Sequence, residues 1–329
     1  MHINIAQVLH TLKFRLSIIS THRAEFMGLA IIWIMMYHFG FTQSHTLGII
    51  TQFGFSGVEI FMFVSGFGLY FSLNKDSNLL TFYLKRFVRI FPTYYLIGII
   101  DSVYIYHDNI TEYLFRYTTI GYWTGGIIGD WYIPSIVILY ALCPLFKWLL
   151  DQRVLFLYCI IAVFLFLSWF WAINDNIIDR SHYFFVYRIP AFLFGMICAQ
   201  RFLQEKSDSF FFVTLIIGIP CFVILFSEYK MTYNFLFFSF LFLLPTSLVL
   251  CGYISRCSYI ESPLSRIGQS SLEIYLIQGV FYHAILYKVI IIPKQWHDFS
   301  TIIFIIISSL FGIMVHKLIS ITIQKIKFK

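Results

Sequence analysis

Two ionisable residues lie in long apolar runs of the sequence, where a hydrocarbon environment would penalise them. His38 ends the run Leu29–Tyr37, and Glu59 lies in the glycine- and serine-containing segment 54–68. An imidazole titrates near neutrality and can take a proton from a hydroxyl group, so His38 could act as a general base. It could equally be an interfacial histidine. Glu59 could orient the histidine, stabilise an imidazolium, or pair with an arginine such as Arg188.

A basic pair, Arg86 and Arg89, precedes the apolar segment Phe91–Tyr106. Residues three apart share one face of a helix, and two guanidinium groups on one face can bind a phosphorylated ligand. The same pattern is typical of an ordinary anchor that binds lipid headgroups at a membrane surface.

The composition indicates which elements must position these side chains. The chain has 329 residues, of which 59% are hydrophobic and 12% charged, against about 25% charged in soluble proteins. Lipid must therefore solvate most of the surface. We predict an all-α polytopic membrane protein of about ten transmembrane helices in a single domain, residues 23–322. A cytoplasmic leader, 1–22, precedes it, and a basic cytoplasmic tail, 323–329, follows it.

The predicted spans are apolar segments of about the ~20 residues that a membrane-crossing helix needs. They are Phe26–Thr42, Phe53–Leu73, Phe91–Tyr106, Trp131–Leu150, Val154–Ala172, Tyr183–Arg201, Phe210–Ser227, Tyr233–Gly252, Ser271–Ile291 and Thr301–Ile321.

The basic residues predict the orientation of these spans. With a cytoplasmic N-terminus, 17 of the 23 Lys and Arg residues fall on the inside; the other six are Arg116, Arg180, Arg188, Lys230, Lys288 and Lys294. The positive-inside rule favours this arrangement, with both termini cytoplasmic in a plasma membrane, specifically a bacterial inner membrane. The net charge of +7 then reflects topology and contact with membrane lipid, rather than nucleic-acid binding.

The six cysteines do not indicate a metal site. They are scattered through the chain, without a CxxC motif or a Cys/His spacing typical of metal ligands. We interpret them as small apolar residues that pack within helices. We therefore predict that the protein requires no metal.

Six short motifs occur in the order typical of one known family. They are Tyr37-His38, Gly57–Phe61 with Val64–Phe67, Arg86–Pro92, Trp131–Pro134, Arg188–Gly195 and Gly268–Gln278. Over roughly residues 23–281, the chain resembles the membrane-bound acyltransferase family 3, whose members O-acylate sugars, peptidoglycan or macrolides.

The resemblance implies a function and a set of site residues. The essential histidine would be His38. Arg86 and Arg89 would meet acyl-coenzyme A on the cytoplasmic side, and the acyl group would cross to an acceptor on the outer face. With Glu59 as a partner of the histidine, we predict an O-acetyltransferase that uses acetyl-coenzyme A or another acyl-coenzyme A and acts on a cell-surface or lipid-linked carbohydrate. The motifs also suggest substrate or supporting roles for Arg23, Trp131, Arg188 and Gln278.

Two positions depart from the family pattern. Met27 stands where the family often has an arginine, and Arg23, one helical turn earlier, could replace it. Gln278 stands where the family usually has a second histidine; an amide can donate and accept hydrogen bonds, but it cannot shuttle a proton at neutral pH.

A transporter or flippase for a small solute or lipid-linked sugar is the alternative. His38 and Glu59 could then form a proton relay, although the two halves of the chain show no similarity of the kind found in many transporters. A purely structural scaffold would leave both residues without a role.

Overall fold

The computed structural model describes residues 16–41, 45–76, 78–124, 130–173, 180–204 and 243–325. Within these ranges the regular elements are helices and there is no strand, which confirms the all-helical fold class. The predicted span 210–227 lies outside the described residues. So do residues 233–242 of the next span, residues 1–15 of the leader and residues 326–329 of the tail.

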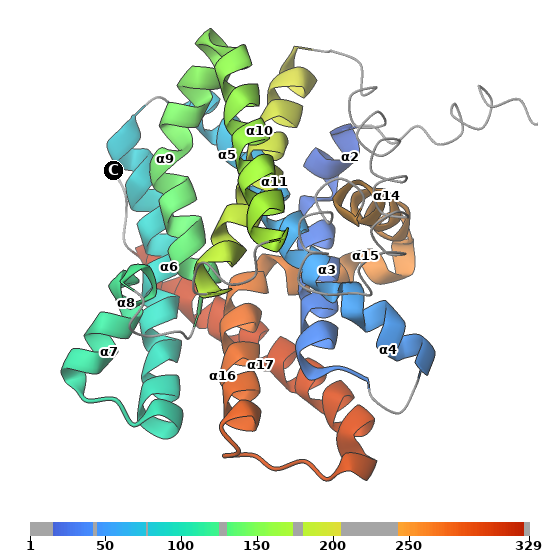
Figure 1. Ribbon diagram of the computed structural model, residues 1–329. Coiled ribbons are helices and arrows are strands. Elements are labelled where there is room, and N and C mark those ends of the chain that lie inside the picture. The colour runs from blue at the N-terminus through green and yellow to red at the C-terminus, as the bar shows by residue number, and fades with distance from the viewer. Residues whose placement is uncertain are drawn as a thin grey trace, which may run out of the picture.

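The helices of the described residues pack against one another in a bundle (Figure 1). They are α2 (Leu16–Thr21), α3 (Arg23–Phe39), α4 (His45–Gln52), α5 (Ser56–Lys75), α6 (Leu79–Asp101), α7 (Ile110–Tyr117), α8 (Ile120–Trp123), α9 (Tyr132–Gln152), α10 (Val154–Ile173), α11 (Arg180–Leu203), α14 (Leu244–Ile254), α15 (Ser258–Gln269), α16 (Ser271–Leu286) and α17 (His297–Lys325). Three shorter helical turns are η1 (Phe53–Phe55), η2 (Ser102–Tyr106) and η4 (Lys294–Trp296).

Four helical stretches among the described residues are long and apolar enough to cross a membrane. They are Thr46–Lys75, Leu79–Tyr106, Tyr132–Gln152 and Lys294–Thr322. Shorter apolar helices of 10–17 residues cover Val154–Leu167, Leu244–Ile254 and Ser271–Leu286. The structure thus supports a membrane protein, while the full count of ten spans stays a prediction.

Helix α5 forms the centre of the bundle, in contact with α3, α9, α11 and α14. Its residues are apolar on all sides, and most of its side chains are buried, as expected for a helix surrounded by others. Glycines allow α11 to approach it closely. A Cβ atom on Gly66 would lie 2.0 Å from the carbonyl oxygen of Phe192, and one on Gly195 would lie 2.1 Å from that of Phe63. The backbones of α5 and α11 are therefore in direct contact.

Helix α3 is held against α15 in the same way. A Cβ atom on Gly28 would lie 2.3 Å from the carbonyl oxygen of Leu264, and one on Gly268 would lie 1.7 Å from that of Ala24. This contact fixes the helix that carries His38 relative to the Gly268–Gln278 motif, because α16 follows α15 directly.

The C-terminal ends of α3, α6 and α16 lie on the same side of the bundle, at the bottom of Figure 1 together with α4 and α7. We call this side the His38 end, and the region away from it, where α16 begins beside Arg89 of α6, the Arg89 end. The three C-terminal ends bring residues more than 200 positions apart in the sequence to one place, where the candidate site lies.

We expect Gly195→Val to lower stability by at least about 1–3 kcal/mol, the usual cost of overpacking a core, because the new side chain would meet the backbone of α5. Thermal unfolding of the detergent-solubilised protein measures the effect. Gly279→Ala is the matched control, since a Cβ there meets nothing within 4 Å. Equal melting temperatures for Gly195→Val and the control would contradict the close packing.

Candidate active site

A cavity of about 810 Å³ lies at the His38 end of the bundle. Four residues singled out from the sequence line it: His38, Trp131, Arg188 and Gln278. The rest of its wall is rich in tyrosine and also holds several ionisable side chains, namely Tyr37, Tyr94, Tyr106, Tyr117, Tyr275, Tyr282, Asp101, Arg116, Asp130 and His283. The cavity thus combines aromatic surfaces with polar groups inside a largely apolar protein.

The histidine of α3 and the glutamine of α16 meet in the wall of this cavity. Nδ1 of His38 lies 2.9 Å from Oε1 of Gln278, and Gln278 is buried. An amide oxygen only accepts hydrogen bonds, so Nδ1 carries the hydrogen of this contact, and in the neutral ring Nε2 then has the lone pair. The rings of Tyr37 and Tyr282 flank the imidazole, with centroids 5.5 and 5.1 Å away.

Glu59 and Arg188 form a buried ion pair between α5 and α11. Their side chains are 0% and 2% exposed, so both charges are removed from solvent and depend on each other. Pairing with Arg188 is one of the roles that the sequence left open for Glu59. In the part of the chain that the structure describes, the hydrogen bond of His38 goes to Gln278 rather than to Glu59.

The predicted arginine pair lies toward the Arg89 end, outside the cavity lining. Arg86 donates a hydrogen bond of 2.8 Å to Oγ of Ser72. Arg89 forms an ion pair with the buried Glu273 of α16 through both carboxylate oxygens. Arg86 is thus the more available of the two for an anionic ligand.

Arg23 also lies toward the Arg89 end, at the start of α3. Its guanidinium lies against α5, because a Cβ atom on Gly68 would come within 2.6 Å of its Nη1. Its charge is close enough to that of Arg86 for the two to repel each other. Two cations held close together favour a bound anion.

Comparison with known proteins identifies the family. The family described as Acyltransferase domain matches residues 28–318, most of the chain. The chain belongs to this acyltransferase family. The resemblance seen in the six motifs is therefore confirmed, and the predicted enzyme class agrees with it.

A protein named as an acetyltransferase is similar to the chain over a shorter stretch. The protein named "Putative acetyltransferase ORF330" from Acidianus two-tailed virus is 32% identical over 93 residues, which cover 27% of this chain and 28% of the relative. The chain thus aligns with less than a third of that relative's length. No solved structure matches the chain.

The acyltransferase cavity also holds ionisable residues that we did not predict from the sequence. His283 of α16 lies with Nδ1 2.8 Å from Oδ2 of Asp101 at the end of α6. Asp130 accepts hydrogen bonds of 2.9 Å from the Tyr275 hydroxyl and from the backbone N–H of Tyr132. Asp101 and His283 occur in apolar segments, so the rule that selected His38 and Glu59 could have found them too.

Two carboxyl groups near the cavity have pKa values that are shifted in opposite directions. Burial raises the pKa of Asp130 to about 6, although hydrogen bonds from Tyr275 and the Tyr132 backbone lower it. Burial also acts to raise the pKa of Asp108, but hydrogen bonds from Arg116 and Ser102 bring that pKa below its ordinary value. Asp108 therefore stays ionised and neutralises Arg116, while Asp130 changes charge in mildly acidic solution.

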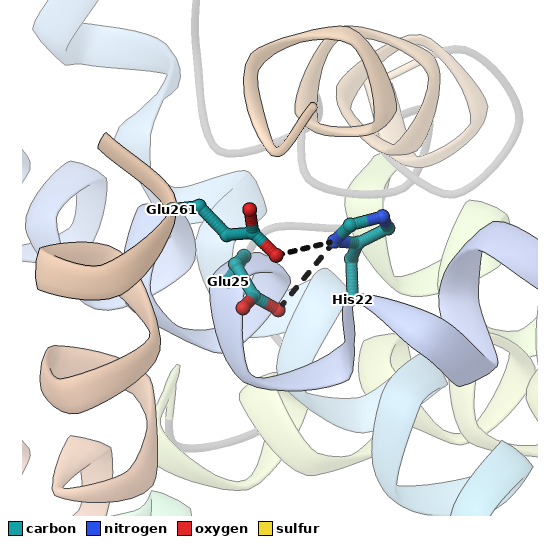
Figure 2. Close-up of side chains that lie close together, drawn as sticks. All are labelled: His22, Glu25 and Glu261. Atoms are coloured by element: carbon teal, nitrogen blue, oxygen red, sulfur yellow. Dashed lines mark ion pairs between the residues drawn. The ribbon is translucent and has the colours of Figure 1, made fainter. Parts of the chain in front are cut away.

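A second cluster of ionisable residues lies at the junction of α2, α3 and α15 (Figure 2). Nδ1 of His22 lies 4.0 Å from Oε2 of Glu25 and 3.9 Å from Oε1 of Glu261. Ligand atoms on a shared zinc ion, each about 2.1 Å from it, would be about 3.4 Å apart. The distances in the cluster are longer than these, so a shared metal ion would require the side chains to move closer.

We expect Glu59→Gln to destabilise the protein by roughly 3–5 kcal/mol, because it leaves Arg188 buried without its counter-charge. Thermal unfolding measures the loss, and the double change Glu59→Leu with Arg188→Met should recover most of it. A Glu59→Gln protein with unchanged stability but no acyl transfer would instead assign the carboxylate a role in the chemistry.

Proposed function

We propose that the protein is a membrane O-acyltransferase that moves an acyl group, specifically acetyl, from acyl-coenzyme A to a hydroxyl group of a cell-surface or lipid-linked carbohydrate. One observation carries the proposal: in a chain of an acyltransferase family, a histidine with a lone pair on Nε2 lines an aromatic-walled cavity inside the helical bundle. No feature of the described residues favours the transporter or flippase alternative.

His38 is the general base in this proposal. Its Nδ1–H donates to Gln278, which holds the ring in one orientation and one tautomer. Nε2 takes the proton of the acceptor hydroxyl as the oxygen attacks the thioester carbonyl carbon. The carbon–sulfur bond then breaks, and the proton passes from His38 to the departing thiolate. Gln278 thus orients the base, a role that needs no titratable group.

The cavity supports a carbohydrate as the acceptor. Tyrosine and tryptophan rings offer flat surfaces for the apolar faces of sugar rings, and carboxylates accept hydrogen bonds from hydroxyl groups. A volume of about 810 Å³ is in the range of cavities that hold small-molecule ligands.

A smaller cavity supports a short acyl group. It has a volume of about 130 Å³, and its lining includes His38 and the apolar side chains of Phe39, Ile285 and Phe304. The imidazole therefore lies between a large cavity lined by tyrosines and ionisable groups and a small one. An acetyl group fits a space of this size far better than a long acyl chain does.

The donor approaches from the Arg89 end, with its phosphates on Arg86 and Arg23. Arg89 joins them if a phosphate replaces Glu273 as its partner. The surplus of basic residues in the predicted inner segments favours a cytoplasmic Arg89 end with both termini on that side, in a plasma membrane. Acyl-coenzyme A would then enter from the cytoplasm, while the carbohydrate meets His38 from the other side.

His38→Ala should lower acceptor-dependent thiol release from acetyl-coenzyme A by about 10²–10⁴-fold, the usual contribution of a positioned base. Thiol release by the purified protein in nanodiscs measures it. His107→Ala, which changes an exposed histidine outside the cavity, is the control. Undiminished transfer by the His38→Ala protein would remove the proposed base.

Arg86→Ala should raise the KM for acyl-coenzyme A by about one to two decades with little change in kcat. One charge-assisted contact to phosphate contributes roughly 1.5–3 kcal/mol. Steady-state kinetics at saturating acceptor measures the shift, and Lys85→Ala, which changes an exposed neighbouring cation paired with Asp76, is the control. Equal KM values for the two variants would show that Arg86 serves only as an anchor.

A further inference from the structure

Two carboxyl groups in the wall of the large cavity each accept hydrogen bonds from the protein through only one of their two oxygens. Asp101 directs Oδ2 to His283 at 2.8 Å and to the Tyr117 hydroxyl at 3.4 Å. Its Oδ1 is buried and has no hydrogen-bond partner among the described residues. Asp130 shows the reverse, with Oδ1 used by the protein and Oδ2 buried without such a partner. Each side chain thus has one oxygen whose hydrogen-bonding capacity the described residues leave unsatisfied.

The two carboxyl groups belong to one region of the cavity. Asp101 is at the end of α6 and Asp130 directly precedes α9, and both line the cavity. His283 connects them, because it contacts Asp101 directly and its charge also acts on Asp130. The ring of Tyr106 packs against His283, with centroids 5.6 Å apart. The two carboxyl groups therefore belong to the wall of the same cavity, one from the end of α6 and one from the segment before α9.

The charges around this space exclude an anionic ligand. Arg116 is neutralised by the two oxygens of Asp108, at 2.8 Å each, and Arg188 by Glu59. The cavity's two arginines are thus already paired, and among the described lining residues only His283, which contacts Asp101, offers a further positive charge to the two carboxyl groups. A group that donates hydrogen bonds is favoured, and a carboxylate or phosphate is repelled.

We propose that Asp101 and Asp130 form the acceptor subsite, in which Oδ1 of one and Oδ2 of the other accept hydrogen bonds from two hydroxyl groups of an uncharged sugar. This rests on the acyltransferase function proposed above and specifies its substrate class as a neutral rather than an acidic glycoside. His283 is a positioning residue that holds Asp101. The subsite anchors the sugar, and a further hydroxyl reaches His38.

Binding of simple glycosides to the nanodisc-embedded protein tests the subsite without requiring turnover. Saturation-transfer NMR compares methyl β-glucoside, methyl β-glucuronide and methyl β-glucosaminide as neutral, anionic and cationic probes. We expect the neutral glycoside to bind about tenfold or more tightly than the anionic one, since a buried carboxylate repels a second carboxylate. Preference for the glucuronide, or no binding of the glucoside, would overturn the proposal, whereas tighter binding of the glucosaminide would support the negative charge of the subsite.

Variants then locate the binding. Asp101→Ala and Asp130→Ala should each weaken glucoside binding about tenfold or more, the usual effect of losing a hydrogen bond to a charged group. Asp130→Asn keeps an acceptor oxygen but removes the charge, so it should retain most glucoside binding and reduce the discrimination against glucuronide. Asp151→Asn is the matched control, because this carboxylate lies outside the cavity and is paired with Lys147 and Tyr70.

Two further measurements separate the subsite from the proposed function. Variants that fail to fold are recognised by size-exclusion chromatography, and Asp101→Asn then replaces Asp101→Ala, with at least threefold weaker binding expected. Thiol release from acetyl-coenzyme A with the native surface glycan as acceptor is measured in parallel. Active wild-type protein with unaltered glucoside binding in the variants would overturn the subsite alone, whereas glucoside binding without any thiol release would reject the acyltransferase function.

Discussion

The buried pairing of Glu59 with Arg188 is the interaction on which the rest of the site depends. It joins α5 to α11 at the same interface where Gly66 and Gly195 bring the two backbones into contact. Removing both charges from solvent carries a large desolvation cost, so the pair persists only if the helices hold the two groups together. Arg188 in turn lies near the ring of Trp131, 5.6 Å from its centroid, and lines the cavity. One ion pair thus ties the packing of the central helix to the shape of the site.

Helix α16 connects the two ends of the proposed reaction path. Glu273 holds Arg89 at one end, Gln278 orients His38 near the middle, and His283 contacts Asp101 at the other end. From Glu273 to His283 the helix rises by about 15 Å, at about 1.5 Å per residue. A rotation or shift of α16 would therefore alter the donor side, the base and the acceptor side together. The close contact of α15 with α3 restrains that movement.

Ionisable residues in apolar segments could be recognised from the sequence, because burying them in hydrocarbon costs free energy. The contacts that these residues make with distant parts of the chain could not. His38 and Glu59 were selected because they interrupt apolar runs. Arg188, 129 positions away, was named as one of several possible partners of Glu59, whereas the contact of His38 with Gln278, 240 positions away, was not predicted. Without an alignment, such pairs cannot be read from spacing. Gln278 was predicted to be unable to shuttle protons, and its use as an orienting acceptor depends on the meeting of α3 and α16. The approach of Glu261 to His22 likewise depends on the contact between α15 and α3.

The separation of the arginines from the histidine is itself informative about the donor. Arg86 and Asp101 are 15 residues apart on α6, which corresponds to about 22 Å along a helix. A phosphate at Arg86 and the group that reacts at His38 must therefore be separated by at least about 7.5 Å along the bundle, because Gln278, the partner of His38, follows Glu273, the partner of Arg89, by five residues on α16. Acyl-coenzyme A meets this constraint, because its thioester lies at the end of a long flexible arm that begins at its phosphates. A donor that binds by its phosphates at Arg86 and extends along the bundle as far as His38 therefore agrees with the proposed function.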